Sequence, residues 1–282
     1  MTIRIYADNA CDLDTAAIEE NKIRLFHMPV TVKDRTYRDR LTISPTEFYK
    51  LLEDPDVIPT TAQVTPVEFQ TEFEKVMHET EDEIIYIAFS SGLSGTYQSA
   101  CIAREAVNLD RITVIDSKSA SVGYGLTVLR AAKAVSGGKS KDEVIADIED
   151  NIKRIQHIFI VGNFDMLKRG GRVNPAAAVL GNLLNIKLLL HFVDGQIVPL
   201  EKAHGLKKAK KRMREIMLER GSADLSEQVI GINHSNDLSG ALEIKELIEH
   251  EFGCTQFVIS EIGAAIGSHV GAGTYSVFFL TD

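Results

Sequence analysis

Short apolar runs rich in β-branched residues alternate with helical patterns along most of the chain. The apolar runs predict strands, and several segments between them repeat apolar residues at the spacing of amphipathic helices. Strands that alternate with helices are typical of parallel βαβ units, in which helices cover a parallel sheet. The predicted strands are Ile3–Asp8, Ile23–Val32, Glu83–Phe89, Ile112–Asp116, His157–Gly162, Gln228–His234, Thr255–Glu261 and Thr274–Thr281.

Capping signals mark the starts of several helices. "SPTEFYKLLED" and "TPVEFQTEFEKVMHET" each begin with Ser/Thr-Pro-x-Glu, and "SKDEVIADIEDNIKRI" has the same Ser-x-x-Glu spacing. The first residue can cap the helix, the proline lacks an N–H where none is needed, and the glutamate reaches back to close a capping box. These segments are therefore predicted to be helices.

The pattern changes near residue 160. "NPAAAVLGNLLN" predicts a helix of small apolar residues, and "IKLLLHFVDGQIVPLEKA" predicts two antiparallel strands that turn at Asp194-Gly195. The second half is therefore expected to carry a mixed sheet. We predict an α/β protein of two domains, residues 1–157 with a parallel sheet and residues 158–282 with a mixed sheet, pressed together around a ligand cleft.

Composition and charge argue against several classes of protein. The chain of 282 residues has a formal net charge of −9, which argues against nucleic acid as the main partner because that role needs a concentrated basic surface. The three cysteines are scattered, which favours a reducing cytoplasm over a disulfide framework or a zinc site. Neither a signal peptide nor an apolar run long enough to span a membrane is recognisable. We expect a soluble cytoplasmic protein.

"SSGLSGTYQSA", after the third predicted strand, is the first candidate for chemistry. Ser94 is a candidate nucleophile, but the Gly-x-Ser-x-Gly elbow of serine hydrolases ends here in Thr96 instead of glycine. Ser94 is also a candidate cap for the helix that follows, an interpretation that we favour over the nucleophile. The third interpretation, which we favour, is anion binding by hydroxyls and by the free N–H groups of a glycine-rich helix start. The complete Gly-x-x-x-x-Gly-Lys-Ser/Thr phosphate loop does not occur in the chain.

Other segments are ambiguous on their own. "PTTAQVTP" is a second hydroxyl cluster, and His269 lies among glycines, where a packed, hydrogen-bonded ring is more common than a ligand. The histidines show no metal-ligand spacing. "MLKRGGRVNP" is either a solvated loop or a phosphate or partner contact, for which arginine is well suited. "GLKKAKKRMREIMLER" predicts a basic amphipathic helix, either simply solvated or in transient contact with a partner or an anionic membrane surface.

Taken together, the segments resemble the DegV family. "IYADNACDL", "TTAQVTPVEF", "SSGLSGTYQSA", "VIDSKSASVGYGL", "FDMLKRGGRVNP" and "GSHVGAG" occur in that family's order and at about its separations, from residue 3 to the C-terminus. The family resembles the fatty-acid-binding subunits of bacterial fatty acid kinase. The resemblance implies an α/β/α N-terminal domain, an α/β C-terminal domain and one long-chain fatty acid in a tunnel between them, with no cofactor and no metal.

The resemblance also implies roles for particular residues. Thr61 and Ser94 would hold the acyl carboxylate, with His269 beside them, and Arg169 and Arg172 would lie where a separate ATP-dependent kinase subunit phosphorylates that carboxylate to an acyl phosphate for phospholipid synthesis. The carrier itself would catalyse nothing. Supporting positions around the carboxylate would be Gln63, Gly92, Gly95, Thr96 and Gly267.

This sequence departs from the family pattern in places that leave those residues intact. The first strand ends in "DNACDL", position 62 is alanine where serine is frequent, and "GAG" replaces Gly-Pro-Gly near the C-terminus. Neither hydroxyl cluster contains lysine or arginine, so we expect neutral donors to hold the head group. The alternatives are an enzyme, either a serine hydrolase or a small-molecule phosphotransferase, and a sensor of another small carboxylate that uses the same Ser94 loop.

Overall fold

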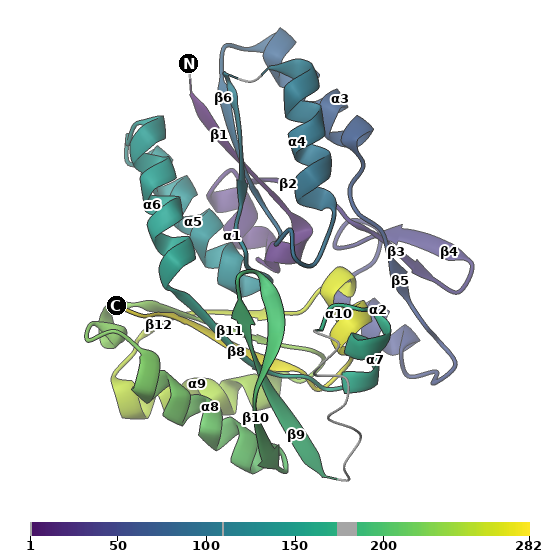
Figure 1. The fold of residues 1–282 in the computed structure, drawn as a ribbon, viewed down its shortest axis with the longest axis vertical. Helices are drawn as coiled ribbons and strands as arrows, with labels where there is room; N and C mark the ends of the chain where they lie inside the picture. Colours follow the sequence, from purple (N-terminus) through teal and green to yellow (C-terminus); the bar gives the residue numbers. More distant parts are fainter. Residues whose placement is uncertain (1, 109, 174–184) are drawn as a thin grey trace.

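The structure, a computed structural model, describes residues 2–108, 110–173 and 185–282. Within these ranges its strands form three sheets, and two of them are the centres of two packed units (Figure 1). The third is small and lies beside both.

The first half of the chain is built around a four-stranded parallel sheet with the strand order β2-β1-β6-β7. Nearly every residue of β6 is buried, as expected for a sheet covered on both faces. Helices α3 and α4 lie on one face and α5 and α6 on the other, which confirms the α/β/α expectation (Figure 1). The elements are β1 (Ile3–Asp8), the 3-10 helix η1 (Asn9–Cys11), α1 (Thr15–Glu20), β2 (Arg24–Phe26), α3 (Pro66–Glu79), β6 (Glu83–Ala88), α4 (Thr96–Val107), β7 (Ile112–Asp116), α5 (Val122–Ser136) and α6 (Lys141–Arg154).

The second half is built around a six-stranded sheet with the order β10-β9-β8-β13-β11-β12. Strands β11 and β12 are parallel and the other neighbours are antiparallel, so the predicted mixed sheet is confirmed. Helices α8 and α9 cover one face of it (Figure 1). The elements are β8 (Ile155–Ile160), β9 (Ile186–Val193), β10 (Gln196–His204), α8 (Leu206–Arg220), η3 (Leu225–Glu227), β11 (Val229–His234), α9 (Leu238–Phe252), β12 (Gln256–Glu261) and β13 (Tyr275–Leu280).

A smaller group of elements lies at one side of the junction. Its strands follow the order β4-β3-β5, and helix α10 packs against β3, β5, α2 and α7. Because α10 comes from the C-terminal part of the chain, it connects the second unit to the small sheet of the first. The elements are β3 (Pro29–Val32), β4 (Arg35–Arg38), α2 (Pro45–Leu51), β5 (Thr60–Thr61), α7 (Phe164–Arg169) and α10 (Ala264–Val270).

The two faces of the second sheet pack against different partners. Ile158 and Ile160 of β8 face the core beneath α8 and α9, whereas Phe159 belongs to the core of the first unit. This alternation is the two-residue period of a strand. Helix α5 covers part of the opposite face, where Val122 packs against Phe278. The remainder of that face borders the cavity described below.

The local predictions are confirmed. The capping boxes of α2, α3 and α6 form at Ser44, Thr65 and Ser140, each with its glutamate. The hairpin turns at Asp194-Gly195, where both residues have positive φ, as a tight two-residue turn requires. The predicted helix at 174–185 falls almost entirely outside the described residues. The second sheet begins at Ile155, shortly before the boundary expected at residue 157.

One predicted strand is wrong. The segment Ile23–Val32 is not continuous, because β2 pairs with β1 in the parallel sheet and β3 pairs with β4 and β5 in the small one. Between them the Met28 N–H donates to Asn9 Oδ1 at 2.6 Å, away from either ladder. Pro29, the first residue of β3, is a local signal against one continuous strand, but it does not reveal which sheet each half joins.

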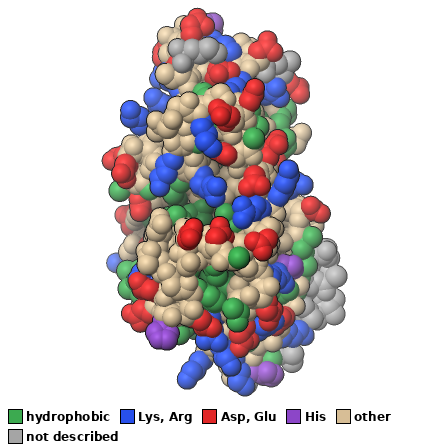
Figure 2. Space-filling model, turned by 90° about the vertical axis from the view of Figure 1, so that its left-hand side faces the viewer, with side chains coloured by type: hydrophobic (Ala, Val, Ile, Leu, Met, Phe, Trp, Pro, Cys, Tyr) green, Lys and Arg blue, Asp and Glu red, His purple; other side chains and the backbone are tan. Residues whose placement is uncertain are grey.

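Charges on the surface are largely mixed. On the face shown in Figure 2, lysine and arginine side chains are interspersed with aspartate and glutamate. The basic helix α8 follows the same pattern, since Arg212 pairs with Glu201 and Glu219 while Ala209 and Met213 are buried. In the described part of the chain, no helix is both long enough and apolar enough to cross a membrane.

Candidate functional site

A cavity of about 390 Å³ lies between the first unit and the face of the second sheet that α8 and α9 do not cover. Most of its wall is apolar, and this volume is in the range of small-molecule binding sites. Both halves of the chain contribute to the wall, which agrees with the expected position of a ligand between the domains. Apolar lining residues include Leu93, Phe159, Leu167, Phe192, Ile197 and Phe278.

Thr61 and His269 meet at the cavity wall. Thr61 is on β5 and His269 is near the end of α10, and the Thr61 Oγ1 to His269 Nε2 distance is 2.9 Å. Burial, with a smaller contribution from the charge of Arg172, lowers the pKa of His269 to about 4. The ring is therefore neutral near pH 7. Its Nδ1 is buried and has no hydrogen-bond partner among the described residues.

Ser94 also lines the cavity, in the loop between β6 and α4. Its Oγ lies 2.9 Å from Thr96 Oγ1 and accepts the Thr96 N–H at 3.2 Å. Helix α4 begins at Thr96, with Gly95 at the N-cap and no side-chain hydrogen bond from that residue. His269 is bonded to Thr61 and not to Ser94, so these contacts do not form the serine–histidine pair that a hydrolase requires.

Gln63 and Gly95 line the cavity next to Ser94. Gln63 Nε2 donates to Ser99 Oγ at 2.8 Å, which fixes the amide against the start of α4. A Cβ on Gly95 would overlap Gln63 Oε1, so the glycine permits this close approach.

Three of the predicted supporting residues lie outside the cavity wall. Thr96 is fully buried behind Ser94, where its Oγ1 accepts the Val64 N–H at 3.3 Å. Gly92 packs against the hairpin turn. A Cβ at this position would lie only 2.7 Å from Gly195 O, so no larger residue fits. Gly267 packs against Tyr49 in the same way. These positions bring the elements of the site together without facing a ligand.

The two arginines occupy different places. Arg172 lines the main cavity, and its Nε donates to Leu93 O at 3.1 Å. Arg169 lines a neighbouring cavity of about 280 Å³, whose wall also includes Thr61, Arg172 and His269. An arginine therefore lies near the neutral groups that are expected to hold the head group. The Gly170-Gly171 turn, where Gly171 has a φ of +68°, brings Arg172 back to the cavity, and no local pattern in the sequence reveals this return.

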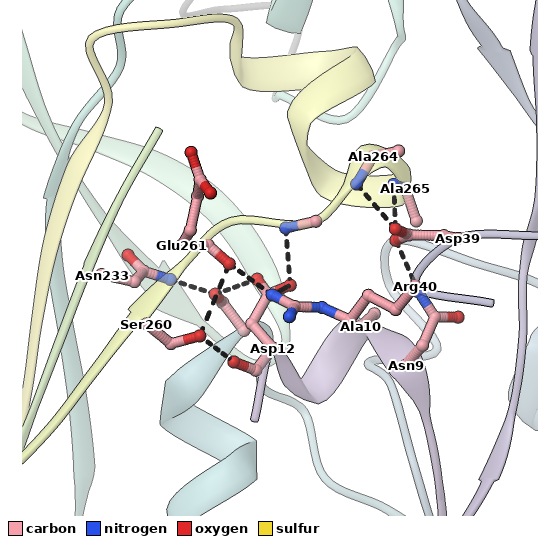
Figure 3. A network of polar contacts seen from close by, with 12 residues as sticks. Asn9, Ala10, Asp12, Asp39, Arg40, Asn233, Ser260, Glu261, Ala264 and Ala265 are labelled. Carbon is pink, nitrogen blue, oxygen red and sulfur yellow. Dashed lines mark hydrogen bonds and ion pairs between the residues drawn. The ribbon is translucent and has the colours of Figure 1, made fainter. Parts of the chain in front are cut away.

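Sequence reasoning also missed a buried ionic network at the start of α10 (Figure 3). The Asp39 carboxylate accepts the N–H groups of Ala264 and Ala265, each at 2.9 Å. Asp12 Oδ1 accepts the Gly263 N–H at 2.8 Å and pairs with Arg40 at 3.2 Å. Burial raises the pKa of Asp12, and the charge of Arg40 opposes that rise. The network fixes the end of α10 that lies opposite to His269.

In the part of the chain that the structure describes, no group of histidine, cysteine and acidic side chains is arranged to hold a metal ion. The polar groups at the cavity are thus hydroxyls, amides, one neutral imidazole and one arginine.

Comparisons with known proteins agree with this architecture. The family model described as "Uncharacterised protein, DegV family" matches residues 2–282. A DegV domain-containing protein of Caldanaerobacter subterraneus is 35% identical over 277 residues, covering 98% of each chain.

Two solved structures are similar over the whole length. A DegV family protein from Thermus thermophilus, described by its fatty acid binding, has a TM-score of 0.89 at 30% identity, with 100% of both chains covered. DegV of Bacillus subtilis, described as a fatty acid binding protein, has a TM-score of 0.88 at 30% identity and the same coverage.

Proposed function

This chain belongs to the DegV family, and we propose that it binds one long-chain fatty acid in the cavity between its two domains and presents the carboxylate to a separate kinase. Thr61, Ser94 and His269 form the carboxylate site. The kinase subunit supplies ATP and phosphorylates the carboxylate to an acyl phosphate, and the carrier forms no bond itself. The fatty acid binding of the Thermus and Bacillus proteins supports the first part of this proposal.

The observation that carries the proposal is the asymmetry of the cavity. One end collects Thr61, Ser94, Gln63 and His269, while aromatic and aliphatic side chains form most of the remaining wall. A long acyl chain gains ~0.8 kcal/mol for each methylene group removed from water, which favours binding of the tail. A buried carboxylate, by contrast, needs hydrogen-bond donors to offset the loss of water. The cavity meets both requirements.

The tautomer of the neutral His269 ring determines how Thr61 acts. Because the ring is neutral, Nε2 carries a proton in one tautomer and donates it to Thr61 Oγ1. The Thr61 hydroxyl proton is then free to point into the cavity and to donate to a carboxylate. His269 is in this way a positioning residue for Thr61.

The neighbouring cavity marks the side from which a kinase would reach the carboxylate. Thr61, Arg172 and His269 border both cavities, so the head-group end is adjacent to the space that Arg169 lines. An arginine fork suits phosphoryl oxygens. These observations support the proposal that Arg169 contacts the phosphate donor or the kinase.

The decisive experiment is the identification of ligand in purified protein. We expect mass spectrometry of the denatured protein to recover long-chain fatty acid in near-equal molar amount. Protein that is always empty, and that cannot be loaded with stearic acid after delipidation, would contradict the proposal. Ester hydrolysis that is lost in Ser94→Ala would instead support the hydrolase alternative.

A further inference from the structure

Two polar side chains lie on the otherwise apolar sheet wall of the cavity. Asn233 on β11 and Ser276 on β13 are direct partners across the antiparallel pair, and both line the cavity. Their chain neighbours Ile232 and Val277 belong to the core beneath α8 and α9. The strand period therefore places both polar side chains on the cavity face, the face that also carries Phe278.

The hydrogen bonds around Ser121 fix the orientation of the Asn233 amide. The Ser121 hydroxyl donates its only proton to Asp12 Oδ2 at 2.5 Å, so its oxygen can only accept from Asn233. Asn233 must then direct Nδ2 toward Ser121, and this hydrogen bond is present. The amide oxygen, Asn233 Oδ1, therefore points away from Ser121.

That oxygen lacks a partner. Asn233 is fully buried, and its Oδ1 makes no hydrogen bond with the described residues. The Ser276 hydroxyl lines the same wall, and this residue is 6% exposed. Buried polar groups are nearly always paired, so an unpaired buried acceptor beside a hydroxyl indicates that a ligand group completes the acceptor.

The position of the pair relates it to the acyl chain. Helix α10 borders the cavity, with His269 near its C-terminal end and Ala265 near its start. Asn233 is connected through Ser121 and Asp12 to Gly263, just before that start. At ~1.5 Å per helical residue, the six residues from Gly263 to His269 span roughly 9 Å along the helix axis. The polar pair is therefore connected to the end of α10 that lies away from the proposed carboxylate site.

We infer that the cavity is specific for a long-chain fatty acid that carries a hydroxyl group partway along its chain, an inference that rests on the proposed fatty-acid function. The ligand hydroxyl donates to Asn233 Oδ1 and accepts from the Ser276 hydroxyl. A plain methylene group leaves the Asn233 oxygen unpaired, and a keto group has no proton to donate to it. A hydroxyl satisfies both protein groups at once.

The test compares delipidated protein binding to stearic acid with its binding to monohydroxystearic acids that differ in the position of the hydroxyl. We expect one mid-chain isomer to bind roughly tenfold more tightly than stearic acid, the effect of one buried hydrogen bond between otherwise unpaired groups. Asn233→Leu should abolish that preference while retaining stearic acid binding. Ser276→Ala, which does not touch the Asp12 network, should reduce the preference if Asn233→Leu fails to fold.

Thr274→Val is the matched control. Thr274 also lines the cavity, but its hydroxyl already donates to Val270 O at 3.1 Å and accepts the Gly162 N–H at 2.8 Å. This variant should keep the preference for the hydroxylated isomer. The inference is overturned if every hydroxylated isomer binds no better than stearic acid, or if the preference survives in Asn233→Leu. Protein that binds neither stearic acid nor any hydroxylated isomer overturns the proposed function as well.

Discussion

The N-terminal end of α10 lies at a carboxylate network of the protein itself, and its C-terminal end lies at the site that we propose for the ligand carboxylate. The two ends are built differently. At the N-terminal end, Asp39 and Asp12 are permanent parts of the protein, held by backbone N–H groups and by Arg40. At the C-terminal end, His269 and Thr61 offer a neutral imidazole and a hydroxyl to the cavity. A carboxylate that never leaves can be held by a full set of ionic and backbone contacts. One that must be exchanged or phosphorylated is better held by donors that release it.

The first prediction removes the permanent carboxylate and carries the largest expected effect. Asp39→Ala strips the partner from the N–H groups of Ala264 and Ala265 and from Asn9 Nδ2. Because each unpaired buried donor costs about 1–3 kcal/mol, we expect a loss of about 3 kcal/mol or more in the free energy of unfolding. Denaturant titration measures this loss.

Asp54→Ala is the control for that experiment. Asp54 is also a paired aspartate, but its side chain is 44% exposed and bonds to Lys33 at 3.0 Å. Its removal should change the free energy of unfolding by less than about 1 kcal/mol. Equal losses in the two variants would show that the Asp39 network does not stabilise the fold as described.

The second prediction removes the donors proposed for the exchangeable carboxylate. Thr61→Ala combined with Ser94→Ala should weaken fatty-acid binding on the order of 100-fold, about tenfold for each hydrogen bond to the buried anion. The free energy of unfolding should fall by only about 1 kcal/mol, mainly because the Thr96 N–H loses its acceptor on Ser94. Titration with stearic acid and denaturant unfolding measure the two quantities.

Thr71→Ala provides the matched hydroxyl deletion, since Thr71 Oγ1 bonds only to Val67 O on the surface of α3. It should leave binding unchanged. Full acyl binding in the double variant would show that the carboxylate lies elsewhere. If the double variant lost as much stability as Asp39→Ala, Thr61 and Ser94 would stabilise the fold as the Asp39 network does, and the proposed contrast between the two ends of α10 would be wrong.

The difference between the two ends also explains what the sequence could reveal. The capping boxes at Ser44, Thr65 and Ser140 and the turn at Asp194-Gly195 involve residues a few positions apart, so their patterns are readable locally. The hydroxyl clusters around Thr61 and Ser94 were recognisable for the same reason, as short groups of unusual composition.

The ionic network was not recognisable because its partners are distant in sequence. Asp39 bonds to residues more than two hundred positions away, and nothing in "YRDRLT" distinguishes it from a solvated loop. The split of Ile23–Val32 into two sheets and the return of Arg172 to the cavity likewise depend on long-range packing. Side-chain types were enough to propose the exchangeable site, whereas only the fold identified the permanent one.

The third prediction concerns the neighbouring cavity and should have the smallest effect on the fold and on binding. Arg169 is exposed and does not line the main cavity, so Arg169→Ala should leave stearic acid binding within about twofold and the free energy of unfolding within about 0.5 kcal/mol. Phosphorylation of the bound acyl group by a fatty acid kinase subunit should nevertheless fall roughly tenfold, because a charge-assisted contact to phosphoryl oxygens is lost. Lys168→Ala removes an adjacent exposed charge that borders neither cavity, and it should leave phosphorylation unchanged. If both variants lost phosphorylation equally, Arg169 would act only through general surface charge. If phosphorylation were unchanged in Arg169→Ala, the proposed contact of Arg169 with the phosphate donor or the kinase would be wrong.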